Sequence, residues 1–401
     1  MIKLIRVEHL KPGMYIHDLN CGWLNHPFLT TAFLVRNQET IDKIIDLGIR
    51  ELYIDTGKGT DVKIAKSQAE VNAELEQRLQ DIAVIDADKP ATTELRDEVV
   101  RARRLHSEAG KVIRQILEDI RLGQDVRVDR AEQVVDGMVD SVFRHSDALL
   151  PMTRLRNLDE YNFGHSVNVC TLLIAFGRAI KLPREVIKEL ALGGLLHDIG
   201  KVNVPDTIVN KPGKLSDNEF ARMQLHVAEG LRLLGDLPGV GEVARQVVAE
   251  HHERLDGSGY PAQLAGSALS SYGQMAGIVD VYDAISSERI YGRGMPQTQA
   301  LKKLLEWSKH HFDPQLVQAF IRSIGIYPTG ALVRLESNRM GVVVEQNEES
   351  LLEPLVRVFY HAGQRHYIPP QIIDLSKSQD RIASFESFEK WKINPYQWLP
   401  T

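Results

Sequence analysis

The sequence predicts a mainly α-helical protein with a small α+β domain at its N-terminus and a short β extension at its C-terminus. Apolar residues recur with the period of a helix over residues 125–325, and no strand pattern lies between the helices. They alternate in the manner of strands over residues 1–62 and again from residue 326 onward. The 401 residues exceed the ~100–200 residues typical of one domain, and the hydrophobic fraction of 43% is ample for a buried core.

The predicted N-terminal domain, residues 1–62, places one helix among short strands. The segment ETIDKIIDLGI is amphipathic with a helical period and ends at Gly48, a residue type that commonly terminates helices. Alternating apolar residues predict strands in KLIRV, GMYIHDL, FLTTAFLV and ELYIDT. This mixture of elements indicates a small α+β module.

Residues 63–124 carry many charges of both signs among regularly spaced leucines and valines. Their spacing predicts two amphipathic helices that are separated at Pro90. We interpret this region as a charged, solvated helical connector that packs on its neighbours. The alternative is a coiled coil that joins two copies of the chain into a homodimer, although the heptads are short.

The predicted helical domain, residues 125–325, contains clear helix starts. Pro183 stands near the start of one helix, and Ser216 with Glu219 forms a capping box at the start of another. Beyond this domain the segments ALVRLES, MGVVVEQ and PLVRVFYH alternate and are separated by turn residues. They predict a β-rich extension over residues 326–401.

Composition narrows the class of protein. Lys and Arg number 48 against 54 Asp and Glu, so the net charge of −6 gives no sign of a nucleic-acid-binding surface. Cys21 and Cys170 suggest no disulfide framework, which fits a reducing compartment. The N-terminus lacks an apolar signal core, and the run VNVCTLLIAFG is shorter than the ~18–20 residues that span a bilayer. We therefore expect a cytoplasmic protein with no membrane partner.

Histidines and acids gather in helices that otherwise read as buried. Asp198 follows His197 directly, and Asp280 lies inside GIVDVYDAI. Burying an unpaired carboxylate costs several kcal/mol, so a nearby cation is the economical explanation. Histidine nitrogens and carboxylate oxygens without cysteine suit Fe, Mn, Zn or similar divalent ions. Five histidines fall between residues 165 and 252, namely His165, His197, His226, His251 and His252.

These seven residues are too many for one tetrahedral site. They suit two metals that share a carboxylate, ~3.5–4 Å apart, which generate a hydroxide for an in-line phosphoryl displacement. Asp198 is the natural bridge, and Lys201 follows on the same helical face, where it could neutralise a phosphate or assist the leaving group. A single histidine in a buried helix is more often a core residue than a ligand. We give that structural interpretation to the other doublet, His310-His311.

Several separated motifs resemble the HD-GYP family, a branch of the HD metal-dependent phosphohydrolases that hydrolyses cyclic di-GMP. Residues 1–60 also resemble a domain of unknown function that often precedes HD-GYP domains in bacteria, through LKPGMYI and HPFLTTAFLV. The resemblance to HD-GYP proteins covers about residues 130–325 and implies an all-helical HD-GYP core. Its motifs are HDIGK (197–201), NKPGKL (210–215), His226, HHERLDGSGYP (251–261), DVYDAISSER (280–289) and HFDPQLVQAF (311–320).

The resemblance implies a role for each matching residue. Asp198 would bridge two metals and take part in catalysis, and Lys201 would be the catalytic lysine. Arg289 would contact substrate phosphate, and substrate contacts are also expected from Lys211, Lys214, Gly259 and Tyr260, although the loop of Lys211 and Lys214 could instead simply cap the following helix. The implied metal ligands are His165, His197, Asp198, His226, His251, His252 and Asp280.

Two positions depart from the family pattern. Some members have a glutamate four residues before the first histidine that helps to bind a third metal, but here that position is Tyr161, with Glu160 one place away. This favours a two-metal site. The basic residue expected three positions after Arg289 is replaced by Gly292, and Arg293 stands one place along.

The resemblance implies a cyclic di-GMP phosphodiesterase of bacterial second-messenger signalling, linked to biofilm formation and motility. Two divalent ions are expected, Fe or Mn first and Zn, Ni, Co or Mg as alternatives. The product would be linear pGpG, and in some members GMP. Two alternatives stay open: hydrolysis of another nucleotide, or a non-catalytic receptor or scaffold that binds cyclic di-GMP or GGDEF-domain proteins.

Overall fold

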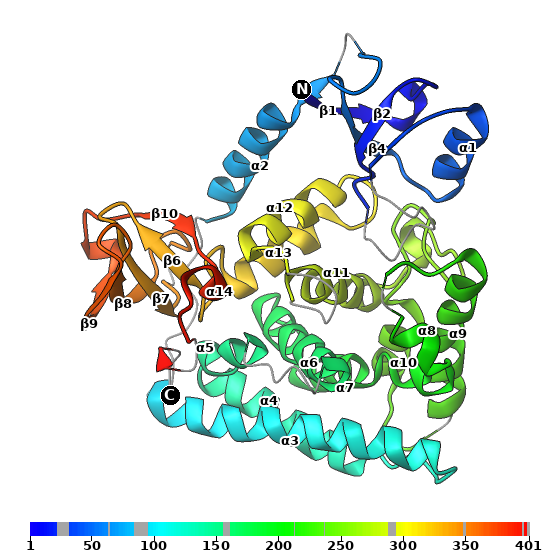
Figure 1. The fold of residues 1–401 in the computed structure, drawn as a ribbon. Coiled ribbons are helices and arrows are strands. Elements are labelled where there is room, and N and C mark those ends of the chain that lie inside the picture. The colour runs from blue at the N-terminus through cyan, green and yellow to red at the C-terminus, as the bar shows by residue number, and fades with distance from the viewer. Residues whose placement is uncertain are drawn as a thin grey trace.

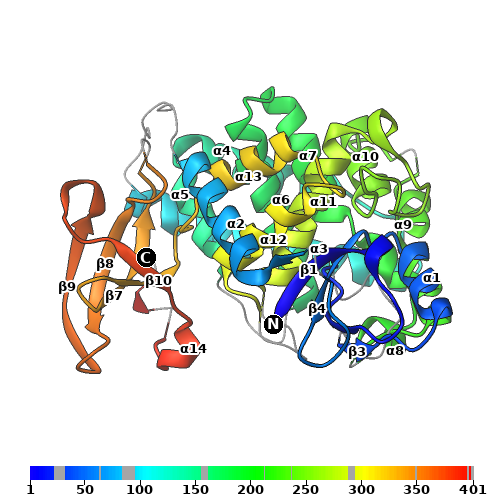
Figure 2. The same cartoon turned by 90° about the horizontal axis from the view of Figure 1, so that it is seen from above.

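A computed structural model describes residues 1–21, 32–62, 65–83, 95–154, 161–211, 213–235, 237–287, 294–347, 350–394 and 397–398. Within these ranges the chain forms an N-terminal α+β unit, a central body of helices and a C-terminal sheet (Figure 1). Seen from above, the two small sheets lie apart on different sides of the helical body (Figure 2). The predicted fold class is confirmed.

The N-terminal unit is an antiparallel sheet of order β3-β2-β4-β1-β5 with one helix beside it. Helix α1, Gln38–Asp46, starts at Asn37, whose side chain accepts a hydrogen bond from the Thr40 amide, and it buries Ile41 and Ile44. The predicted helix and strands are confirmed, except that residues 28–31 of FLTTAFLV lie outside the described ranges. The strands are β1 (Ile2–Arg6), β2 (Tyr15–Asp18), β3 (Phe33–Leu34), β4 (Glu51–Asp55) and β5 (Lys66–Ser67).

Two helices follow this sheet. Helix α2, Gln68–Ala83, packs against the later helices α12 and α13, whereas α3, Leu95–Arg121, packs along α4 and α6. The carboxylate of Glu98 on α3 is fully buried and accepts two hydrogen bonds from Arg144 on α4, at 2.7 and 2.9 Å. Helix α3 is thus fastened to the helical body by a buried ion pair as well as by apolar contacts.

The helical body is built around α6 and α11, which are apolar on nearly all sides and therefore lie inside (Figure 1). Ser216 and Glu219 form the predicted capping box, and Pro183 is the N-cap of its helix. The helices are α4 (Asp129–Arg144), α5 (Ser146–Leu149), α6 (Tyr161–Ala179), α7 (Arg184–Leu196), α8 (Asp206–Val209), α9 (Asp217–Leu234), α10 (Glu242–Glu250), α11 (Ser271–Ser286), α12 (Gln297–Trp307) and α13 (Pro314–Ile324).

The C-terminal unit is an antiparallel sheet of order β10-β6-β7-β8-β9, and the predicted strands of this region are confirmed. Asp147 of α5 is buried where the sheet meets the helices, and its carboxylate accepts hydrogen bonds from the Thr329 hydroxyl and the Gln346 amide. The elements are β6 (Leu332–Leu335), β7 (Arg339–Glu345), β8 (Leu355–His361), β9 (His366–Asp374), β10 (Ile382–Phe385) and α14 (Phe388–Trp391).

Two sequence-based expectations concern the chain as a whole. Cys21 and Cys170 are both free, as expected in the absence of a disulfide framework. Across the described ranges, no helix combines the length and the apolar character needed to cross a bilayer.

Gly200 lies where two backbone segments approach each other closely inside the helical body. It lies in the 3-10 turn Ile199–Asn203 that follows α7, and a Cβ here would collide with the His226 carbonyl and the Gly230 amide of α9. We expect Gly200→Ala to lower the melting temperature by roughly 6–10 °C, because overpacking against backbone cannot be relieved by a side-chain rotation.

Gly110→Ala on α3 is the matched control, because nothing lies within 4 Å of its added Cβ. Alanine is the better helix former, so this variant should melt at or slightly above the wild-type temperature. Equal melting of the two variants in a thermal scan would show that the close approach of the turn to α9 does not constrain the fold.

Candidate metal centre and active site

The seven residues expected to meet do so at one place inside the helical body. They come from α6, from the end of α7, from α9, from the end of α10 and from α11. Their ligand atoms form two groups, in each of which all the atoms lie within 4.8 Å of one another. One group is His165, His197 and Asp280, and the other is Asp198, His226, His251 and His252.

Asp198 lies between the two groups. Its Oδ1 is 3.5 Å from His226 Nε2, on the side of the four-residue group. Its Oδ2 is 3.3 Å from His197 Nε2 and 3.9 Å from His165 Nε2, both of the other group. The two oxygens of one carboxylate therefore face two different sets of histidines, which is the arrangement of a bridging ligand.

Asp280 also reaches both groups, from the buried helix α11. Its Oδ1 is 3.0 Å from His165 Nε2 and 4.0 Å from His197 Nε2. Its Oδ2 is 3.8 Å from His252 Nδ1. Two carboxylates thus lie among five imidazoles.

The doublet His251-His252 stands where α10 ends. Helix α10 closes at Glu250 and His251 is its C-cap, so the doublet stands at the point where the regular helix ends. Their ring centroids are 4.2 Å apart, and both rings belong to the same group of ligand atoms as His226. The end of the helix is what allows neighbouring residues to face one site.

Four of the histidines are oriented by an acceptor on the far side of the ring. Carbonyl oxygens accept from Nδ1 of His197, His226 and His251, at 2.8, 2.6 and 3.0 Å. In His165 the same nitrogen lies 2.7 Å from Asp283 Oδ2. A proton held at Nδ1 leaves the Nε2 lone pair free to bind a metal, and such outer partners are typical of metal-binding histidines.

A divalent cation fits this donor set. His197 Nε2 and Asp198 Oδ1 are buried and have no hydrogen-bond partner among the residues that the structure describes. Buried polar atoms are nearly always satisfied, so lone pairs that converge without a donor indicate a missing positive charge. Imidazole and carboxylate ligands without thiolate suit Fe, Mn, Zn and related ions, which agrees with the sequence prediction.

The protonation states favour the same conclusion. Burial opposes ionisation of Asp198 and Asp280, yet the surrounding imidazoles hold the pKa of both carboxyls well below the usual value, and Lys201 adds to this at Asp198. Burial lowers the pKa of His226 to about 4 and that of His251 and His252 well below normal. Charged carboxylates and neutral imidazoles are the forms that bind metal.

His165 has the opposite shift. Burial again disfavours its charged form, but hydrogen bonds to Asp280 and Asp283 outweigh this and raise the pKa of His165 to about 9. Two carboxylates that stabilise a proton on this ring would also stabilise a metal cation at its Nε2.

Asp283 is a residue of the site that sequence reasoning missed. It lies one helical turn after Asp280, is buried, and also accepts a hydrogen bond from Asn168 Nδ2 at 2.9 Å. Asn168 lies one turn after His165 on α6. The sequence did hold a signal for these two residues. Asn168 follows His165 by three positions and Asp283 follows Asp280 by three, so each lies on the same helical face as a predicted ligand.

Lys201 lies beside the centre, as predicted. It belongs to the 3-10 turn after α7, and its Nζ is 2.5 Å from Asp198 Oδ2. The side chain is 33% exposed, so it borders both the buried carboxylate and solvent. A cation in this position can interact with an anionic group that enters from outside.

Residues 253–264, which follow His252 and contain the end of the HHERLDGSGYP motif, form a loop that returns over His252 and is called the signature loop below. Tyr260 stacks on His252 with ring centroids 4.6 Å apart, and Phe220 of α9 meets Tyr260 edge-on. A Cβ on Gly259 would collide with the backbone of Glu253 and Arg254, so glycine is required for this close return of the chain. The loop therefore places an aromatic ring at the edge of the site.

The remaining predicted substrate contacts divide into three cases. Lys211 forms an ion pair at 2.5 Å with Glu219 of the capping box, which agrees with the helix-capping alternative. Lys214 is partly buried, and the electrostatic interaction between it and Cys21 places it toward the N-terminal unit. Arg289, Gly292 and Arg293 lie outside the described residues, as does Glu160, and the side chain of Tyr161 is also outside them.

Comparison with known proteins identifies the family. A domain of unknown function (DUF3391) matches residues 2–131, and an HD domain matches residues 140–316. A cyclic di-GMP phosphodiesterase of Pseudomonas aeruginosa is 42% identical over 396 residues, which cover 98% of this chain and 94% of that protein. The chain belongs to the HD-GYP family.

Other proteins are similar to this HD-GYP chain over shorter stretches or at lower identity. A 3'3'-cGAMP-specific phosphodiesterase of Vibrio cholerae is 40% identical over 127 residues, 31% of this chain and 24% of that protein. An HDG"Y"P protein from Bdellovibrio bacteriovorus, a solved structure, has a TM-score of 0.47 and 18% identity, covering 80% of this chain and 98% of its own.

Asp283→Asn tests the support of His165. The amide keeps the shape but loses the negative charge that orients the ring, so we expect the dissociation constant for Mn²⁺ to rise about 10–100-fold. Ser287→Ala is the control, because it removes only a hydroxyl that donates to the other oxygen of Asp283, at 3.1 Å. Calorimetric titration measures both variants, and wild-type affinity in Asp283→Asn would contradict the assignment.

Proposed function

We propose that the chain hydrolyses cyclic di-GMP to linear pGpG at a centre of two divalent cations. The observation that carries this proposal is the position of Asp198, whose two oxygens face separate groups of imidazoles. His165, His197 and Asp280 would hold one cation, and His226, His251 and His252 the other, with Asp198 shared between them. When bound, such a pair lowers the pKa of water and neutralises charge on phosphoryl oxygens.

The residues of the chain supply orientation and a proton. Lys201 keeps Asp198 ionised, and its partly exposed Nζ is positioned to donate a hydrogen bond to a phosphate that enters the site. We propose that the same ammonium group protonates the departing sugar oxygen as the phosphodiester bond breaks. Tyr260 covers His252 and excludes water from that side of the centre.

Substrate binding and metal identity extend the proposal. Arg289 would contact the phosphate and Tyr260 the base, while Lys214 and Gly259 would shape the entrance. Nitrogen and oxygen ligands in these numbers favour Fe or Mn, with Zn, Ni, Co and Mg as alternatives. Tyr161 stands where a ligand to a third metal would be needed, which supports a two-metal centre. The protein would act in the cytoplasm on a second messenger that controls biofilm formation and motility.

A second substrate deserves a direct comparison. One relative is named as specific for 3'3'-cGAMP, which differs from cyclic di-GMP in one base. Because the centre acts on the phosphodiester, discrimination would depend on the base contacts of the loop around Tyr260. The ratio of kcat/KM for the two cyclic dinucleotides separates these functions, and product analysis distinguishes pGpG from GMP.

Asp198→Ala and Lys201→Ala test the mechanism in the metal-loaded full chain. Loss of the shared carboxylate should reduce turnover by on the order of 10³-fold and lower the metal content, because both groups of ligands lose a member. Loss of the lysine should reduce kcat about 10²-fold with the metal content retained. Steady-state hydrolysis with metal analysis of each sample measures both effects.

Lys188→Ala is the matched control, since Lys188 of α7 forms ion pairs with Asp136 of α4 and with Glu185 of α7 and lies outside the proposed site. It should leave turnover unchanged. Binding of cyclic di-GMP without any turnover, in protein that holds two cations, would instead favour the receptor or scaffold that engages GGDEF-domain proteins.

A further inference from the structure

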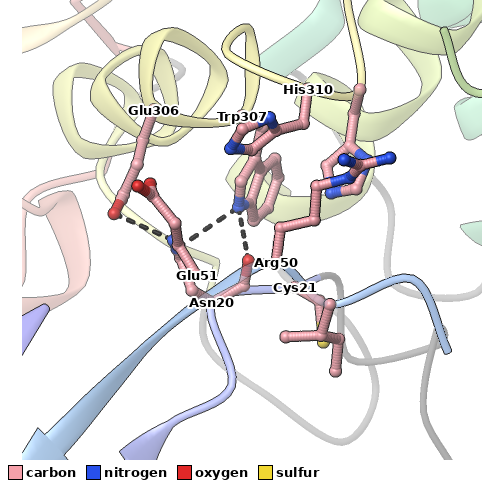
Figure 3. Close-up of a pocket in the computed structure, with 9 residues that line it drawn as sticks. Asn20, Cys21, Arg50, Glu51, Glu306, Trp307 and His310 are labelled. Atoms are coloured by element: carbon pink, nitrogen blue, oxygen red, sulfur yellow. Dashed lines mark hydrogen bonds between the residues drawn. The ribbon is translucent and has the colours of Figure 1, made fainter. Parts of the chain in front are cut away.

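The N-terminal unit packs on the helical body through buried hydrogen bonds. Asn20 donates from Nδ2 to Glu306 Oε1 at 2.9 Å, and its carbonyl accepts from Trp307 Nε1 at 2.7 Å (Figure 3). The Tyr53 hydroxyl donates to the same Glu306 oxygen at 2.7 Å. Asn20, Glu306 and Trp307 are all buried, so these hydrogen bonds form in a largely desolvated part of the contact.

Next to these buried hydrogen bonds, the N-terminal unit also contacts the signature loop. Arg50, which follows α1 and precedes β4, donates from Nε to Asp256 Oδ2 at 3.1 Å. Gly48 packs so closely on Ser258 that a Cβ would collide with its side chain, and the positive φ of +72° at Gly48 brings the backbone there. His311, beside Arg50 in the same small pocket, lies 3.6 Å from the same Asp256 oxygen.

Asp256 connects the Arg50 contact to Tyr260 through hydrogen bonds within the loop. Its Oδ1 accepts hydrogen bonds from the amide and hydroxyl of Ser258, at 3.1 and 2.6 Å, which closes a tight turn two residues before Tyr260. The Tyr260 amide then donates to the His252 carbonyl at 3.2 Å, and its ring stacks on the His252 ring. A displacement of Asp256 therefore reaches the aromatic ring at the edge of the site within four residues.

The loop has a second anchor that belongs to the helical body alone. The buried carboxylate of Glu253 accepts from the Ala262 amide at 2.7 Å and from the Leu264 amide at 3.0 Å. The loop is thus held on one side of Tyr260 by Glu253 and on the other by Asp256. The attachment at Asp256 includes Arg50 from the other domain as well as His311 of the helical body.

We propose that Arg50 is a positioning residue for the active site, acting through Asp256 to hold Tyr260 over His252. This inference rests on the proposed phosphodiester hydrolysis and adds a contribution of the N-terminal domain to it. The Arg50 side chain is 54% exposed, whereas the Asp256 side chain is only 8% exposed. Arg50 therefore lies between the carboxylate of Asp256 and the solvent. Movement of the turn after α1 would first alter the loop and the Tyr260 ring, and would reach His252 only through that ring.

Arg50→Ala, compared with Lys309→Ala, tests the proposal in the full metal-loaded chain. Lys309 pairs with Glu51 at 3.0 Å across the same domain contact, and within the described part of the chain neither side chain has a hydrogen bond or ion pair with the loop. We expect Arg50→Ala to raise KM for cyclic di-GMP about three- to fivefold, with kcat changed less than twofold, because a half-exposed ion pair is weak and Tyr260 borders substrate rather than metal. Arg50→Lys should restore most of the KM, and Lys309→Ala should match the wild type.

Hydrogen exchange gives a readout that does not need turnover. In Arg50→Ala the amides of Ser258 and Tyr260 should exchange faster, while those of Ala262 and Leu264, held by Glu253, should not change. Identical exchange and KM in Arg50→Ala and wild type would overturn the proposal, as would equal effects of Lys309→Ala. A wild-type protein without turnover would refute the proposed function, whereas the exchange data would still decide the role of Arg50.

Discussion

The carboxylate of Asp198 is the constraint around which the helical body is organised. A buried negative charge is stable only beside compensating positive charge, and here three imidazoles and one ammonium group surround it within 4 Å. Within the described ranges of the chain, Lys201 is the permanent cation that contacts this carboxylate, while burial keeps the pKa of His226 near 4. The rest of the positive charge is best provided by metal ions.

The fold brings the ligands to this carboxylate through close contacts between backbones. The turn after α7 packs on α9 at Gly200, which sets Asp198 against His226, and α10 ends where His251 and His252 must face the same point. The signature loop then returns over His252 and meets the N-terminal unit at Asp256. A path of contacts thus runs from the first domain to His252, one of the proposed metal ligands, which makes the N-terminal unit a direct neighbour of the signature loop.

The sequence predicts much of this arrangement. The fold class follows from apolar periodicity, and the meeting of seven histidines and acids follows from motifs whose spacing resembles a known family; their role as ligands stays a proposal. Asp283, Asn168 and the contact of Arg50 with Asp256 were not predicted. These pairings join residues 115 and 206 positions apart in the chain, and periodicity carries no information about such distances. Lys211 is the opposite case, in which a residue predicted to contact substrate has a local partner instead. Its ammonium group donates to Glu219 in the first turn of α9.

Anomalous diffraction from crystals of anaerobically purified protein tests the shared carboxylate most directly. Two metal peaks roughly 3.5–4 Å apart are expected, one nearer Asp198 Oδ1 and His226, the other nearer Asp198 Oδ2 and His197. One peak alone, or two peaks with Asp198 turned away toward Lys201, would contradict the account.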